Sequence, residues 1–83
     1  MKLSQYDFNK LPNDKKVELA SFDGTFLENR FEGEYGINLY SVFGFYAEVW
    51  LHRKENEIEK VVTFTQTRYL EPYLKKINID KIQ

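Results

Sequence analysis

The sequence predicts an α+β domain: a four-stranded, mainly antiparallel meander whose apolar face is covered by N-terminal helices and a C-terminal helix. Residues 25–64 contain four stretches of strand-like alternation, separated by short polar or glycine-containing segments. The segments before and after them place apolar residues at helical spacing. Because 83 residues suffice for one core and no linker interrupts them, we expect residues 1–83 to form a single domain.

Two helices are expected before the sheet. Ser4 is placed to cap a short helix that begins near Gln5 and ends before Pro12, whose ring disfavours helical geometry in the preceding residue. Asn13 is placed to cap a second helix, and Gly24 is expected to end it in the left-handed conformation.

The central segment 37–51 is too long for one strand and is expected to fold into a hairpin. A three-residue loop over 42–44 would use Gly44 as its left-handed residue. That register pairs Ile37 with Val49 and Leu39 with Ala47, so the apolar residues share one face of the sheet. The alternative two-residue turn would place Asn38 opposite Val49, and we prefer the first register for this reason.

The flanking strands are assigned by the same reasoning. Residues 25–32 form the least regular strand, an expected edge that ends in a turn at 33–36. The polar run 54–57 marks the turn of a second hairpin. In this hairpin, Val49 is expected to pair with Val62, and Ala47 with Phe64.

Apolar residues recur at helical spacing near the C-terminus, which predicts a C-terminal helix. We expect this helix to cover the sheet. Pro72 is tolerated there within the first turn, where its missing amide has no helical partner. Residues 77–82 alternate, so they could add a strand to a sheet edge in this or a second molecule, or fray. The residues that carry the helical spacing are Leu70, Tyr73, Leu74 and Ile77.

Four stretches between about Leu11 and Ile79 resemble a group of small, functionally uncharacterised bacterial α+β proteins. The resemblance implies a shared fold and a bacterial source, and it brings no active site with it. The stretches are Gly24–Leu27, Asn38–Tyr40, Phe45–Trp50 and Leu70–Leu74.

Composition excludes several functions. The chain has no cysteine, which rules out disulfides, thiolate metal sites and thiol catalysis. Its formal charge of −1 gives no overall field to attract nucleic acid or anionic lipid. No apolar run matches a signal peptide or a bilayer span, so we expect a cytoplasmic protein without membrane contact.

The sequence contains no catalytic or cofactor motif that we recognise, and it favours a non-enzymatic protein without a cofactor. There is no Gly-x-Ser-x-Gly elbow, and Gly33 and Gly36 lack the neighbours of a phosphate-binding loop. Glu48, His52 and Glu59 could approach one another as ligands for zinc or a related ion. Because three such residues also suit a solvated ion-pair surface, we expect no metal site.

The remaining candidate is an aromatic interaction surface on the other face of the sheet. Tyr and Trp supply large contact areas at low entropic cost, so this face could bind a protein partner or a second copy of the chain. It could instead be covered by a terminal helix or the N-terminal arm. Single-stranded nucleic acid, bound by stacking, is an alternative that the few positive charges disfavour. The surface comprises Tyr40, Tyr46, Glu48, Trp50 and His52.

Overall fold

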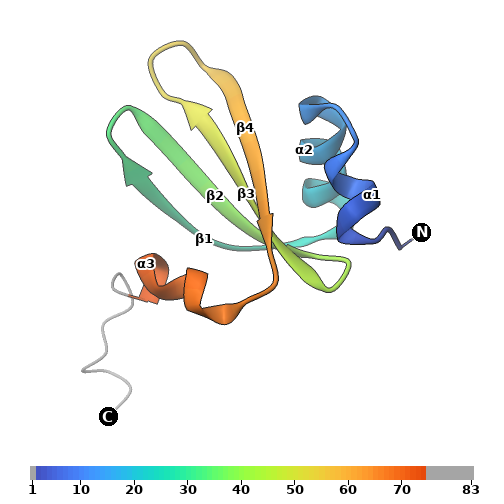
Figure 1. Cartoon of the computed structure of the whole chain (residues 1–83). Helices are drawn as coiled ribbons and strands as arrows, with labels where there is room; N and C mark the ends of the chain where they lie inside the picture. The colour runs from blue at the N-terminus through green and yellow to red at the C-terminus, as the bar shows by residue number, and fades with distance from the viewer. Residues whose placement is uncertain (1, 75–83) are drawn as a thin grey trace.

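The computed structural model describes residues 2–74 and confirms the predicted α+β architecture (Figure 1). Two helices precede a four-stranded antiparallel sheet, and a short 3-10 turn and helix follow it. The elements are α1 (Gln5–Asn9), α2 (Asn13–Asp23), β1 (Thr25–Glu32), β2 (Tyr35–Val42), β3 (Phe45–His52), β4 (Glu57–Phe64), η1 (Thr67–Leu70) and α3 (Glu71–Leu74).

The sheet is a meander in the order β1-β2-β3-β4, so β1 and β4 form its two edges. Figure 1 shows α1 and α2 on one side of this sheet and α3 on the other. The expected edge position of residues 25–32 is therefore confirmed. The helices pack on the sheet as predicted, and they cover both faces, an alternative that the sequence left open.

The register predicted for the central hairpin is wrong. The turn contains two residues, Phe43 and Gly44, and both have positive φ, at 54° and 92°. A two-residue turn of this kind matches the twist of the flanking strands, which explains why the chain selects it. Phe43 tolerates the left-handed conformation because its ring packs against the core, 6.5 Å from the ring of Phe8.

Successive side chains of a strand point to opposite faces, so this one-residue change in register moves side chains from one face of the sheet to the other. Asn38 pairs with Val49 and Leu39 pairs with Glu48, so Leu39 and Val49 point to opposite faces. We call the two sides the α2 face and the α3 face after the helices that cover them. The buried core of the α2 face comprises Phe8, Val42, Phe45, Ala47, Val49 and Val61. That of the α3 face comprises Leu39, Phe64 and Tyr73, with Tyr46 and Leu70 packed against them.

The pairing predicted between β3 and β4 is also wrong by one residue. Val49 pairs with Val61, and Ala47 pairs with Thr63. The register shifts between Trp50 and Leu51, which is the signature of a β-bulge. Because of this shift, Val62 shares the α3 face with Glu48.

The helix ends agree with the sequence in part. The side chain of Ser4 accepts a hydrogen bond from the main-chain N–H of Asp7, as its capping role requires. Pro12, rather than Asn13, occupies the cap position of α2. Gly24 ends α2 in an extended conformation with φ of −102°, so the predicted left-handed terminator is wrong.

Gly24 is required for space and not for a positive φ. A Cβ atom there would lie 2.6 Å from the carbonyl oxygen of Ala20 and 2.8 Å from that of Ser41. Both atoms belong to the main chain, so neither can move away without shifting α2 or β2. Glycine thus allows α2 to end directly against the sheet.

The C-terminal segment begins as predicted, with Pro72 in the first turn of α3. The predicted contributions of Ile77 and of the alternating residues 77–82 lie outside the described residues. Among residues 2–74, none of the helices has the length and apolar character needed to cross a membrane.

Substituting Gly24 by alanine should destabilise the fold by about 1–3 kcal/mol, because the added methyl group overpacks a main-chain contact. Gly36→Ala is a matched control, since a Cβ there would meet only the side chains of Phe31 and Arg53 at ordinary distances of 3.6 Å or more. We expect its effect to stay within about 0.5 kcal/mol. Urea denaturation of both variants measures the difference, and equal stabilities would contradict the close approach.

Candidate functional site

The structure separates the five residues of the predicted aromatic surface. Tyr40 lies on the α2 face, where its ring centroid is 5.7 Å from that of Phe26. Tyr46, Glu48, Trp50 and His52 lie on the α3 face. Only part of the expected surface therefore exists, and η1 and α3 cover the end that contains Tyr46.

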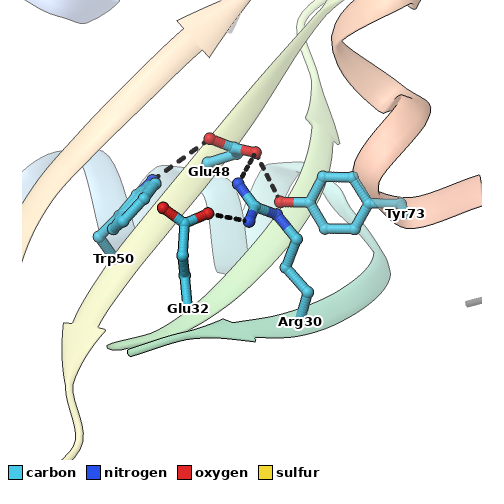
Figure 2. Close-up of polar contacts among 5 residues, drawn as sticks. All are labelled: Arg30, Glu32, Glu48, Trp50 and Tyr73. Carbon is cyan, nitrogen blue, oxygen red and sulfur yellow. Dashed lines mark hydrogen bonds and ion pairs between the residues drawn. The ribbon is translucent and has the colours of Figure 1, made fainter. Parts of the chain in front are cut away.

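Glu48 is the centre of a polar network on the α3 face and is the buried charged residue of the described core, with 6% of its surface exposed. Figure 2 shows three side chains converging on its carboxylate. The Tyr73 hydroxyl donates to Oε2 at 2.6 Å, and Arg30 Nη2 donates to the same oxygen at 3.4 Å. The Trp50 indole N–H donates to Oε1 at 3.2 Å. Both carboxylate oxygens are thus satisfied from within the protein.

Arg30 carries the network towards the surface. Its Nη1 donates to Oε2 of Glu32 at 2.6 Å, while only 14% of the Arg30 side chain is exposed. Burial alone lowers the pKa of this guanidinium, but the bond to Glu32 and the nearby Tyr73 and Glu48 outweigh that effect and raise its pKa. Arg30 therefore stays charged, as a buried counter-ion of Glu48 must.

One atom of this network has no partner. The Arg30 Nε–H is buried and lacks an acceptor, the sole such side-chain atom that the structure reports for residues 2–74. Buried donors are nearly always satisfied, so an orphan of this kind calls for an explanation.

The network depends on the observed register. Arg30 pairs with Ile37 on β2, and Ile37 pairs with Trp50 on β3, so three neighbouring strands direct Arg30 and Trp50 to the same face. The chain then returns over this face through η1, and α3 places Tyr73 above Glu48. The network ties α3 to the sheet by hydrogen bonds as well as by apolar contact.

Cations and aromatic rings surround Trp50. The Lys60 ammonium lies 4.3 Å from the Trp50 ring centroid, and the Arg30 guanidinium lies 5.6 Å from it. The Tyr35 ring packs edge-on at 5.7 Å. These contacts hold Trp50 in one orientation and leave it half-buried.

His52 belongs to a separate set of contacts near the hairpin ends. Its Nε2 lies 3.0 Å from a carboxylate oxygen of Glu34, and its Nδ1 accepts the main-chain N–H of Glu55 at 3.2 Å. Glu48 is committed to the network around Tyr73. Within residues 2–74 no group of three or more histidine and carboxylate side chains could hold a metal, so the set Glu48, His52 and Glu59 does not assemble.

A groove of about 600 Å³ lies beside the network, between β4 and the segment formed by η1 and α3. It lies within the usual size range of small-molecule sites. Apolar side chains and two guanidinium groups contribute to its walls. The lining residues are Arg30, Glu48, Val62, Thr63, Phe64, Arg68, Tyr69, Glu71 and Pro72.

A second surface lies along the edge strand β1. Phe26 is 54% exposed, Leu27 is 45% exposed and Phe31 is 59% exposed. We call these three residues the β1 patch. Long apolar edges invite association with another chain, so natural proteins usually protect them with charge or cover.

Sequence reasoning missed Arg30 and Tyr73. The signal was Glu48 itself, a carboxylate in the middle of the most apolar strand, which needs a cation and further donors when buried. Arg30 can be identified as that cation only after the register places it on the same face. In the sequence, Tyr73 has the spacing of an ordinary core residue of the C-terminal helix, so nothing marks its hydroxyl as a partner of Glu48.

Glu48→Gln removes the charge that pairs with Arg30 while keeping the shape of the side chain. Breaking a buried pair leaves an uncompensated charge, so we expect a loss of about 3 kcal/mol in the free energy of unfolding. Glu32→Gln is the control: its carboxylate is more than half exposed, and we expect a loss below about 1 kcal/mol. Denaturant titration checks both values, and equal losses would contradict a central role for Glu48.

Tyr73 should make stability depend on alkaline pH. Burial and the hydrogen bond to Glu48 raise the pKa of the Tyr73 hydroxyl above that of the unfolded chain. As the pH rises, the unfolded chain therefore loses the Tyr73 proton before the folded chain does. The stabilisation that the Tyr73 hydroxyl gives to the folded protein is complete below about pH 10 and declines as the pH rises further.

Tyr73→Phe should lower stability by about 1–3 kcal/mol at pH 8, because Glu48 loses a buried donor. It should also flatten the decline in stability above about pH 10. Denaturation between pH 8 and pH 11.5 measures both, with exposed Tyr6→Phe as control. An unchanged alkaline slope in Tyr73→Phe would show that Tyr73 does not carry the effect.

No family model, curated protein or solved structure matches this chain at a significant level. The resemblance to small bacterial proteins remains a prediction. Function must therefore be inferred from the network, the groove and the β1 patch themselves.

Proposed function

We propose that this protein is a non-enzymatic contact module that uses the β1 patch to bind a second copy of its own chain. The observation that carries the proposal is the exposure of Phe26, Leu27 and Phe31 on an edge strand. An edge of this kind can bury apolar area and extend a sheet in the same contact.

The exposed side chains at the start of β1 favour a second copy of the chain as the partner. Phe26 and Leu27 are adjacent on this edge strand, and a two-fold contact would bring the same two side chains of both chains together. Apolar residues then meet apolar residues across the contact. A two-fold contact also closes after two chains, which avoids open-ended assembly.

The polar network supports a structural role more than a catalytic one. A general acid or base needs access to a substrate, whereas the Glu48 oxygens accept bonds from Tyr73, Arg30 and Trp50 in a buried position. The same bonds hold the α3 face rigid. A rigid module with an apolar edge suits protein contact.

The nucleic-acid alternative rests on stacking of bases against Trp50. Lys60 and Arg30 offer positive charge there, but both already lie close to the Trp50 ring. A base would have to displace at least one of them. This alternative predicts salt-sensitive quenching of Trp50 fluorescence by oligonucleotides.

Leu27→Asp should weaken self-association by at least roughly tenfold, because it places an unpaired charge in an apolar contact. Leu74→Asp is the matched control, since Leu74 on α3 is also a leucine with nearly half of its surface exposed. Sedimentation equilibrium over micromolar to millimolar concentrations gives the dissociation constants. Circular dichroism confirms that both variants are folded.

Two outcomes would overturn the proposal. The first is a wild-type protein that stays monomeric up to about 1 mM, a limit that corresponds to roughly 4 kcal/mol of association free energy. The second is a dimer that Leu27→Asp and Leu74→Asp weaken equally, since the contact would then lie elsewhere.

A further inference from the structure

We propose that the groove between β4 and the η1–α3 segment binds a small carboxylate ligand that has an aromatic or aliphatic body. The groove lies on the α3 face and is distinct from the β1 patch. Three features of its lining indicate this ligand chemistry: an arginine without an acidic partner, a buried donor without an acceptor and an apolar wall.

Arg68 supplies a positive charge that the protein does not neutralise. Its guanidinium lies 5.1 Å from the Tyr69 ring centroid, and its Nη2 donates to the Tyr69 hydroxyl at 3.2 Å. Across residues 2–74 it forms no ion pair with a carboxylate. Guanidinium groups bind carboxylates through strong, charge-assisted hydrogen bonds, so Arg68 is suited to hold an acidic head group.

Arg30 supplies the second donor. Its buried Nε–H has no acceptor, and its side chain lines the same groove. The Nε–H has almost no exposed surface, so an oxygen atom of a ligand would satisfy it only after a side-chain movement opens this end of the groove. Glu48 also lines this end, but its oxygens are already engaged, whereas Glu71 is an exposed carboxylate at the start of α3. Glu71 repels any acidic group that lies beside it, so the single carboxylate of the ligand is expected at Arg68 and a second acidic group is disfavoured.

The rest of the groove is suited to an apolar body. Phe64 forms part of the wall, with its ring centroid 5.6 Å from that of Tyr69 and 5.3 Å from that of Tyr46. Val62 and Pro72 complete the apolar lining. Sites of this size combine apolar walls with a few polar groups that orient the ligand, which is the arrangement seen here.

The probe that tests this inference is 4-phenylbutyrate, with the uncharged 4-phenylbutanol as its matched control. Titration into the ¹⁵N-labelled full chain should shift the Arg30 Nε–Hε signal and the amide signals of Phe64 and Tyr69 in a saturable manner. The alcohol should bind at least roughly tenfold more weakly, because it lacks the charge-assisted bonds.

Two arginine variants separate a specific site from general attraction to positive charge. Arg68→Gln should weaken binding of 4-phenylbutyrate roughly tenfold. Arg53→Gln should leave it unchanged, because Arg53 lies over the Phe31 ring, away from the groove. The absence of saturable shifts, equal binding of the acid and the alcohol, or wild-type binding by Arg68→Gln would each overturn the inference. None of these outcomes bears on self-association through β1.

Discussion

Burial of the Glu48 carboxylate is the constraint on which the rest of the α3 face depends. A charge in this position is tolerated only when a cation and enough hydrogen-bond donors surround it. Arg30 provides the cation, and Tyr73 and Trp50 provide further donors. These residues come from β1, α3 and β3, so one carboxylate joins the edge of the sheet, its centre and the C-terminal helix.

This requirement explains how the described part of α3 is held on a sheet face. The described part of α3 contains four residues, and helices of that length have little stability of their own. Tyr73 anchors it through both apolar contact and the hydroxyl bond to Glu48. On the opposite face, α1 and α2 pack mainly through apolar side chains. The two faces of one sheet are thus stabilised by different chemistry.

The two proposed contacts lie on different surfaces and use different forces. Association through the β1 patch would depend on the removal of apolar area from water, and it tolerates salt. Ligand binding in the groove would depend on the charge of Arg68, which salt screens more strongly near the surface. Trp50 and His52 stood out in the sequence, yet both are held by internal contacts.

The sequence by itself determined the order and type of the elements, because these depend on local patterns. The strand stretches, the helix cap at Ser4 and the edge position of residues 25–32 all follow from nearby residues. The choice between a two-residue and a three-residue turn at Gly44 could not be settled locally, because either turn gives a hairpin. Tertiary packing selects the two-residue turn. Phe43 adopts a left-handed conformation while its ring packs against the core, and Leu39 and Glu48 make their contacts on the α3 face. The polar network and the groove follow from that choice, since a shift of one residue reverses the face of every side chain in a strand.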